Sequence, residues 1–276
     1  MKLIAVDLDG TLLSPEGRVH EADRDALLSA RERGHLVTII TGRLWSGTRE
    51  AARVIAVDRK LACLEGSSIV WGSTGEEHAH HPLPRLAGEA LAGWLDEAGA
   101  ALFLFASDRI VCDRRGEAFL PYVSAWSTEV EVSASTVEHV EWRSDRGTSA
   151  LVAVGPAGVV EGAVEKARRA FPGELFVVTF PIGRLPGDLH GMIARREGVD
   201  KGTALRELAG EAGVALKDTV AIGDWLNDIP MLRVAGRSFA MGQAPVEVRD
   251  AATDIVAETG AVGGGIRAAL LRLGVL

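Results

Sequence analysis

Residues 2–13 read KLIAVDLDGTLL, an apolar run that leads directly into Asp7, Asp9 and Gly10. The run is expected to form a buried strand, and Gly10 opens a turn where that strand ends. Two carboxylates at the end of a buried strand are costly unless a cation or dense hydrogen bonding offsets their charge. Hard oxygen ligands of this kind suit Mg²⁺. The stretch therefore predicts a strand-end site for a divalent ion, with an Asx-type turn as the simpler alternative.

An alternation of apolar strands with amphipathic helices is found at both ends of the chain. In the first third, strands are expected at 3–6, 36–40 and 61–64, and helices at 21–33 and 46–57. Near the C-terminus we expect helices at 201–212 and 229–234, strands at 219–222 and 238–241, and helices near Val246 and Ile266. This alternation is typical of a doubly wound, Rossmann-like parallel α/β sheet with helices on both faces.

Residues 84–186 interrupt this alternation. A helix is expected at 86–98, and two strands at 102–105 and 109–112 form a hairpin that turns at Ser107-Asp108. Proline and glycine gather at both borders of the block, as is common where a chain crosses between domains. We therefore predict a catalytic core made of 1–83 and 187–276, with an inserted α+β cap domain at 84–186.

Composition and charge narrow the possible functions. The chain has 276 residues, of which 47% are hydrophobic and 25% charged, as expected for a folded protein of two modest domains. Its net charge of −8 argues against binding to nucleic acid or to an anionic membrane. Cys63 and Cys112 are expected to be reduced core residues. No signal peptide or transmembrane stretch is recognisable, so a cytoplasmic location is expected.

Three further polar groups follow strands or open a helix. Thr41-Gly42-Arg43 follows the second strand, Lys201 opens a helix with Asp200 as the expected N-cap, and GDWLND at 223–228 follows the strand at 219–222. In an open parallel sheet, functional groups gather at the carboxyl ends of the strands. Each group alone also fits ordinary turn, cap or surface chemistry. Together with Asp7 and Asp9, however, they predict a pocket for Mg²⁺ and a phosphoryl group.

In this order, the four groups resemble the motifs of the haloacid dehalogenase-like (HAD) hydrolases, a superfamily made mostly of phosphatases. The resemblance covers 7–13, 41–43, 201–202 and 223–232. The inserted block resembles the class IIB cap of the Cof-type branch. The resemblance implies a phosphatase that hydrolyses a small phosphorylated metabolite, a sugar phosphate or similar, through an aspartyl-phosphate intermediate.

The resemblance also implies the roles of three carboxylates. Asp7 would be the nucleophile, and Asp9 the acid that protonates the leaving oxygen and then activates water. Two displacements need a nucleophile and a neighbouring acid/base, which explains why both residues are required. Mg²⁺ would be held by the Asp7 side chain, the Asp9 backbone carbonyl and Asp224.

Five other residues would hold the phosphate or support the site. Thr41, the Gly42 backbone and Lys201 would bind the phosphoryl oxygens as charge develops on them. Asn227 and Asp228 would orient Lys201 and the metal-bound water, and a contact of Asp228 with the metal through water stays open.

The sequence departs from the family pattern at two places. Glu65-Gly66-Ser67 stands where related chains usually carry Asn-Gly-Ala, and Arg195-Arg196 stands where Met-Pro is frequent. Both departures leave open whether these residues touch substrate. Residues that could select the substrate are Arg114, Arg115, Tyr122 and Arg184 of the inserted block and His190 shortly after it.

Two other functions are compatible with parts of this pattern. A phosphosugar mutase on the same scaffold would pass the phosphate from Asp7 back to a sugar instead of to water. A non-catalytic nucleotide-binding module would need a glycine-rich loop where Asp7 and Asp9 stand. The sequence does not decide the substrate, the partition between hydrolase and mutase, or the oligomeric state.

Overall fold

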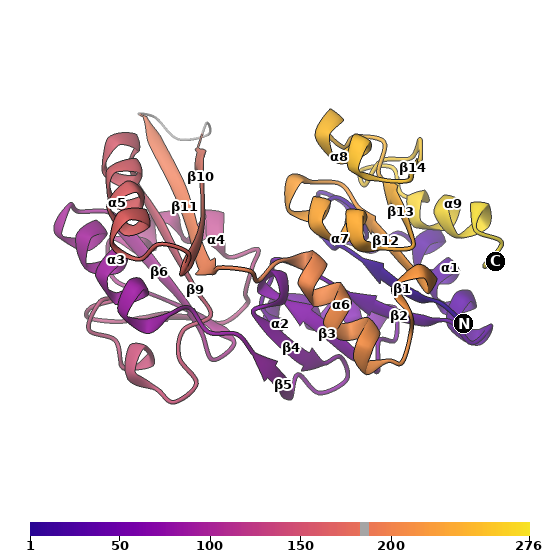
Figure 1. Ribbon diagram of the computed structural model, residues 1–276, viewed down its shortest axis with the longest axis horizontal. Coiled ribbons are helices and arrows are strands. Elements are labelled where there is room, and N and C mark those ends of the chain that lie inside the picture. The colour runs from indigo at the N-terminus through magenta and orange to yellow at the C-terminus, as the bar shows by residue number, and fades with distance from the viewer. Residues whose placement is uncertain (183–187) are drawn as a thin grey trace. The chain divides into compact units, whose positions relative to one another are not determined.

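The structure is a computed structural model that describes residues 1–182 and 188–276, and it contains two compact units (Figure 1). Unit 1 consists of Met1–Gly42, Thr48–Ala79 and Asp200–Leu276, and unit 2 of Arg43–Gly47 and His80–Val199. The expected domain border at 186/187 lies outside the described residues, as does Arg184. The domain limits given above therefore stay a prediction.

A five-stranded parallel sheet forms the centre of unit 1, in the order β14-β13-β12-β1-β2. Its strands are β1 (Leu3–Val6), β2 (Leu36–Ile39), β12 (Thr219–Gly223), β13 (Arg237–Ala240) and β14 (Asp254–Ile255). The two central strands, β1 and β12, are buried along their whole length, which is why they read as continuous apolar runs. The chain leaves β1 toward β2 and leaves β12 toward β13, so the strand order reverses between β1 and β12.

This reversal distributes the helices of unit 1 over both faces of the sheet. They are α1 (Glu21–Glu32), α2 (Trp45–Val54, in unit 1 from Thr48 onward), α6 (Lys201–Glu211), α7 (Ile229–Val234), α8 (Val246–Ala251) and α9 (Gly265–Arg272). Right-handed crossovers that move in opposite directions put their helices on opposite faces. Leu3 of β1 packs with Leu205 of α6 and Leu232 of α7, whereas α1 packs with α9. The doubly wound α/β architecture is confirmed.

The third expected strand pairs differently from the prediction. β3 (Lys60–Cys63) runs antiparallel to β4 (Ser68–Trp71), which adjoins β5 (Glu77–His80) in a separate three-stranded sheet. A single parallel bridge, Ile40 to Ala62, joins β3 to the main sheet. The sequence reading missed β4 and β5. Even so, the end of β3 lies beside the end of β2, since the Glu65 N–H donates to the Thr41 carbonyl at 2.8 Å.

Unit 2 is an α+β unit built on a six-stranded sheet in the order β10-β11-β9-β6-β7-β8. Its strands are β6 (Ala101–Ala106), β7 (Arg109–Cys112), β8 (Val130–Val132), β9 (Ala150–Pro156), β10 (Leu175–Pro181) and β11 (Leu189–Arg196). Neighbouring strands are antiparallel except β7 and β8. The expected hairpin is present, with Ser107 and Asp108 both at positive φ, as a tight hairpin turn requires.

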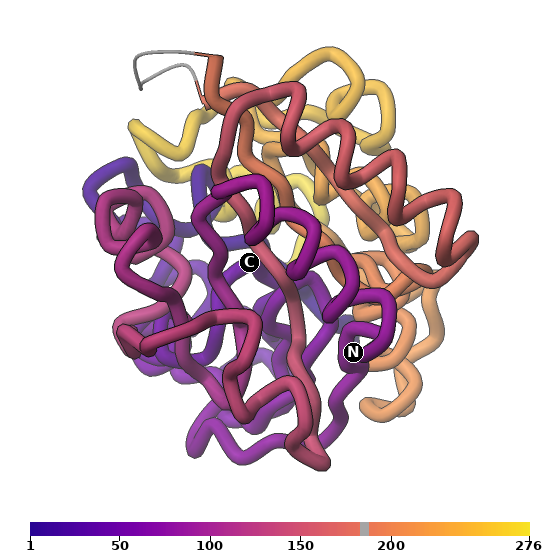
Figure 2. Tube along the Cα trace, turned by 90° about the vertical axis from the view of Figure 1, so that its left-hand side faces the viewer, coloured from indigo at the N-terminus to yellow at the C-terminus, as the bar shows by residue number. Residues whose placement is uncertain are grey.

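Two long helices pack on one face of the unit 2 sheet. They are α3 (Arg85–Glu97) and α5 (Ala157–Ala170), which lie side by side in Figure 2. Unit 2 also contains the short helix α4 (Leu120–Val123). Leu95 of α3 and Val160 of α5 share an apolar cluster with Leu151 of β9. Short 3₁₀ turns complete the description: η1 (Leu64–Gly66), η2 (Gly116–Phe119), η3 (Val140–Arg143), η4 (Leu216–Asp218) and η5 (Leu226–Asp228).

Both cysteines are free and buried, as expected from the sequence. Burial raises the pKa of the Cys112 thiol to about 11, so it stays protonated and unreactive at neutral pH. Among the described residues, no helix combines the length and apolar character needed to cross a lipid bilayer.

Candidate active site

The first two carboxylates of the candidate site come together at the point where the strand order reverses. Asp7 directly follows β1, and Asp224 directly follows the neighbouring β12. The two strands are in parallel register, with Val6 opposite Ile222, and the Asp7 N–H donates to the Ile222 carbonyl at 3.0 Å. Such a reversal point is where open α/β sheets bind their ligands, because the loops on either side diverge there.

Three buried carboxylates gather at this point. Asp7, Asp224 and Asp228 each offer one oxygen, and these three oxygens lie within 4.8 Å of one another. Burial raises the pKa of Asp224 to about 6, and the negative charge of Asp228 adds to the effect. Burial likewise raises the pKa of Asp7 well above its usual range. A set of oxygen donors whose charges are costly in the protein alone fits a hard divalent cation.

Lys201 supplies the one described ammonium group that pairs with these carboxylates. Its side chain is fully buried, and Nζ donates to Oδ1 of Asp7 and to Oδ1 of Asp228, both at 2.6 Å. Burial by itself would lower the pKa of Lys201, but the charges of Asp228 and Asp7 raise it above the usual value. Lys201 is therefore a fixed cation at neutral pH, and it aligns the Asp7 carboxylate.

The start of α6 explains how Lys201 is placed. Asp200 is the N-cap, as expected: its Oδ1 accepts from the Thr203 N–H at 2.8 Å, and Thr203 Oγ1 accepts from the Asp200 N–H at 3.0 Å. This capping box fixes the first turn of the helix. Gly202 allows α6 to approach α7, because a Cβ there would lie 2.7 Å from the Pro230 carbonyl oxygen.

Asp228 organises the loop after β12. While Oδ1 accepts from Lys201, Oδ2 accepts from the backbone N–H groups of Asp224 and Trp225 at 2.8 and 2.9 Å. Both carboxylate oxygens are thus engaged within the protein. Gly223 permits this packing, since a Cβ there would lie 2.5 Å from Cγ of Asp228. The contacts favour a positioning role for Asp228 over direct ligation.

Asp224 is oriented by two further side chains. Thr11 Oγ1 donates to Oδ1 at 3.2 Å, and Gln243 Nε2 donates to Oδ2 at 3.0 Å and to the Gly10 carbonyl at 2.6 Å. Sequence reasoning missed Gln243. It follows the end of β13 by three residues, so the strand-end criterion that found the other groups could have found it too.

Gly10 is required by this arrangement. It has φ of +83°, and a Cβ there would lie 2.3 Å from Oδ2 of Asp224. Gly17 has a similar φ of +76° with nothing within 4 Å, which makes it a matched control. We expect G17A to lose about 1 kcal/mol of unfolding free energy from backbone strain, and G10A to lose roughly 1–3 kcal/mol more from the clash. Urea unfolding of both variants measures the difference, and equal losses would contradict the close approach.

The other predicted residues of unit 1 differ in exposure. Thr41 is buried, and its N–H donates to the Ala62 carbonyl at 3.0 Å. The Asp9 side chain is exposed and does not belong to the carboxylate cluster. Asp7, by contrast, is buried.

Glu65, where the sequence departs from the family pattern, lies next to these groups. Its side chain is buried, and Oε1 accepts from Nδ2 of Asn227 at 2.8 Å. Leu64 and Glu65 have φ of 48° and 62°, a left-handed conformation that costs non-glycine residues on the order of 1–3 kcal/mol each. The hydrogen bond between Glu65 and Asn227 therefore connects the end of β3 to the turn η5.

The second departure and the described candidate selecting residues belong to unit 2. Arg195 lies over the Phe176 ring at 5.2 Å, and Arg196 Nε donates to the Pro82 carbonyl at 2.8 Å. Arg115 is ion-paired with Asp96 and Asp113, and His190 Nδ1 lies 3.4 Å from Oε1 of Glu161. Arg114 and Tyr122 are exposed.

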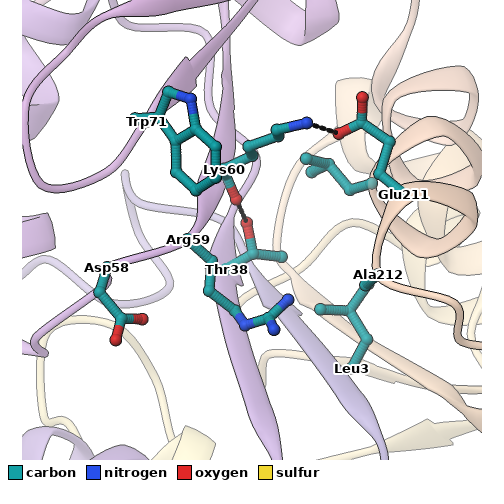
Figure 3. Close-up of a pocket in the computed structure, with 9 residues that line it drawn as sticks. Leu3, Thr38, Asp58, Arg59, Lys60, Trp71, Glu211 and Ala212 are labelled. Carbon is teal, nitrogen blue, oxygen red and sulfur yellow. Dashed lines mark hydrogen bonds and ion pairs between the residues drawn. The ribbon is translucent and has the colours of Figure 1, made fainter.

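A cavity of about 410 Å³ lies at the opposite end of the unit 1 strands (Figure 3). Its wall includes Leu3 and Lys60, which open β1 and β3, and Glu211 at the end of α6. Lys60 Nζ pairs with Glu211 Oε2 at 3.0 Å, and Thr38 Oγ1 donates to the Lys60 carbonyl at 2.8 Å. The carboxylate cluster takes no part in this cavity.

Comparison with known proteins identifies the family. The chain matches the family of haloacid dehalogenase-like hydrolases over residues 4–270. It is 27% identical over 274 residues to 5-amino-6-(5-phospho-D-ribitylamino)uracil phosphatase YwtE of Bacillus subtilis, covering 92% of each chain. A haloacid dehalogenase-like hydrolase from Bacteroides thetaiotaomicron has the same fold, with a TM-score of 0.83, 22% identity and 99% of each chain covered. A sugar phosphatase of HAD subclass IIB aligns with a TM-score of 0.79 at 22% identity, covering all of both chains.

The protein belongs to the haloacid dehalogenase-like hydrolases, and it is therefore an enzyme of a hydrolase family. The resemblance drawn from the four motifs is confirmed.

Proposed function

We propose that this chain is a Mg²⁺-dependent phosphatase that hydrolyses a small phosphorylated metabolite, such as a sugar phosphate. The observation that carries the proposal is the fully buried Lys201, held between Asp7 and Asp228 at the carboxyl end of β1. A fixed ammonium beside a strand-end carboxylate provides both a nucleophile and a counter-charge for a phosphoryl group. One relative is a 5-amino-6-(5-phospho-D-ribitylamino)uracil phosphatase and one structural neighbour is a sugar phosphatase, which supports the same class of substrate.

In the proposed reaction, an oxygen of Asp7 attacks phosphorus while the bond to the leaving oxygen breaks. Asp9 gives its proton to that oxygen and then takes one from the water that hydrolyses the aspartyl phosphate on Asp7. Lys201, Thr41 and the Gly42 N–H hold the phosphoryl oxygens during both steps. Mg²⁺, bound by Asp7, Asp224 and the Asp9 carbonyl, would lower the repulsion between carboxylate and phosphate.

The remaining residues of the site would act through their neighbours. Asp228 positions Lys201 and the backbone N–H groups that follow β12, and Gln243 and Thr11 orient Asp224. We also propose that residues 84–186 act as the cap that selects the leaving group, because the residues assigned in the core would contact only the phosphate and the metal. A cytoplasmic location stays a prediction.

A phosphate-release screen tests the proposal. The wild-type protein is assayed over sugar phosphates, pyridoxal phosphate, nucleotides and polyol phosphates, with Mg²⁺ and with EDTA. Mg²⁺-dependent release from at least one small monoester is expected. Conversion of a sugar phosphate into its isomer without free phosphate would indicate a mutase. Tight nucleotide binding without hydrolysis would indicate a binding module.

The raised pKa of Asp224 predicts how metal and pH act together. An acid whose pKa is raised by folding stabilises the fold while protonated, below the ordinary value of 3.8, and loses that contribution as pH rises through about 6. The metal-free protein is therefore expected to lose stability between these two pH values. Mg²⁺ should restore it above pH 6, and the affinity for Mg²⁺ should fall about tenfold per pH unit below that point.

Thermal unfolding across this pH range, with Mg²⁺ or with EDTA, measures the effect. In D224N measured with EDTA, the melting temperature should depend less on pH than in the wild type. Mg²⁺ should no longer raise the melting temperature of this variant. A wild-type protein whose melting temperature is indifferent to Mg²⁺ at pH 7 would refute the metal assignment.

A further inference from the structure

Glu65 occupies a position that the proposed reaction does not yet use. It follows β3, so it lies at the carboxyl end of a strand, where the functional groups of this fold gather. Its side chain is only 8% exposed, although a carboxylate prefers water. Three consecutive residues, Leu64, Glu65 and Gly66, have positive φ. A buried charge on a strained turn is kept only where surrounding contacts hold it, and such turns cluster at functional sites.

The contacts of Glu65 are made to groups of the candidate active site. Oε1 accepts from Asn227 Nδ2 at 2.8 Å, and the same oxygen would lie 2.7 Å from a Cβ on Gly42. The Glu65 charge also helps to raise the pKa of Lys201, after the larger effects of burial, Asp228 and Asp7. Glu65 thus lies among the residues proposed to hold the phosphoryl group.

The chemistry of a carboxylate gives this contact a direction. An amide side chain at position 65 could offer either an oxygen or an NH₂ to Asn227. An ionised glutamate can only accept, so it selects the orientation of the Asn227 amide in which Nδ2 faces it. That nitrogen carries a second N–H. Asn227 itself is exposed, so its amide is accessible to a ligand.

We propose that Glu65 is a positioning residue that fixes the amide of Asn227 as a hydrogen-bond donor to the phosphoryl group of the substrate. This inference rests on the proposed phosphatase function and deepens it, since it assigns a phosphate donor beyond Thr41, Gly42 and Lys201. The ionised glutamate is a partner of Asn227 that can only accept.

A double-mutant cycle between Glu65 and Asn227 tests this proposal. In E65A the amide loses its partner, and kcat/KM is expected to fall about 10- to 100-fold, as for a lost hydrogen bond to a charged group. In E65Q the side chain can offer either its oxygen or its NH₂ to Asn227, so kcat/KM should fall between the values of wild type and E65A. In an N227A background, E65A should have almost no further effect.

A purely structural role for Glu65 would give a different pattern. Its loss would then lower the melting temperature and activity equally in the wild-type and N227A backgrounds, which would overturn the inference. Wild-type activity in E65A would overturn it as well. E211A is the matched control, because it removes a carboxylate that pairs with Lys60 at the other end of the strands (Figure 3). Its kcat/KM should stay within about twofold of wild type.

Calorimetric titration with inorganic phosphate in the presence of Mg²⁺ makes the same comparison without turnover. E65A and N227A should weaken phosphate binding by similar factors. A wild-type protein that binds phosphate but releases none from any monoester would overturn the proposed reaction and leave this inference standing. Equal phosphate affinity in wild type and E65A would overturn this inference and leave the reaction standing.

Discussion

D7N is expected to abolish phosphate release, with a fall in kcat of about 10⁴-fold or more. The amide oxygen of asparagine is a poor nucleophile and cannot form the aspartyl phosphate through which the reaction is proposed to pass. The fold should survive, because Asn still offers an oxygen to Lys201 Nζ, which lies 2.6 Å from Oδ1 of Asp7 in the wild type. A steady-state phosphate assay and circular dichroism measure the two properties.

Asp218 provides the control for D7N. It is an exposed carboxylate paired with Lys217, in the same unit but before β12, and D218N should keep wild-type kcat. Mass spectrometry of acid-quenched wild-type enzyme should detect a phosphorylated peptide containing Asp7, and the same peptide from D7N should be unmodified. Full turnover by a correctly folded D7N would rule out Asp7 as the nucleophile.

K201M is expected to have the largest effect on stability. It leaves the buried carboxylates of Asp7 and Asp228 without the ammonium that each contacts at 2.6 Å. Breaking a buried ion pair by removing one partner costs roughly 3–5 kcal/mol, because an uncompensated buried charge remains. Activity should fall as well, since the counter-charge for the phosphoryl group is lost. Urea unfolding at pH 7 measures the first effect and phosphate release the second.

The pH dependence of K201M follows from the sign of the carboxylate shifts. Without the ammonium, the pKa of Asp7 in the folded state lies still further above its unfolded value, so protonation stabilises the variant. The difference in unfolding free energy between K201M and wild type should therefore become smaller as pH falls toward about 4. K217M, which changes an 81% exposed lysine, should match wild type at every pH. A K201M protein as stable as wild type at pH 7 would contradict the buried ion pairs.

Local sequence pattern predicted the helices and most strands of the parallel sheet in unit 1, and the first helix and the hairpin of unit 2. β1 is found at the predicted residues 3–6, and α6 begins at Lys201, where the Asp200 cap predicted its start. These elements are governed by interactions between near neighbours, namely the apolar run of a buried strand and the side-chain cap of a helix. The hairpin at Ser107-Asp108 is local in the same sense.

β3 shows where such reasoning reaches its limit. Its apolar residues fit a parallel strand as well as an antiparallel one, and the choice depends on whether β2 or β4 is the partner. No feature of residues 60–63 alone encodes that competition. The left-handed turn at Leu64 and Glu65 was also missed, because neither residue type favours positive φ and nothing in the local sequence indicates it.

The amino-acid sequence by itself determined the α/β class, the family and the candidate residues of unit 1, because buried strands and the polar groups that end them are written in short contiguous stretches. Only the tertiary structure decided how those groups are paired. Lys201 between Asp7 and Asp228, Gln243 on Asp224, and Asn227 on Glu65 are contacts between residues 19 to 194 positions apart. Their partners are set by the register of β1 with β12 and by the approach of α6, and these are properties of packing that no local stretch of sequence contains.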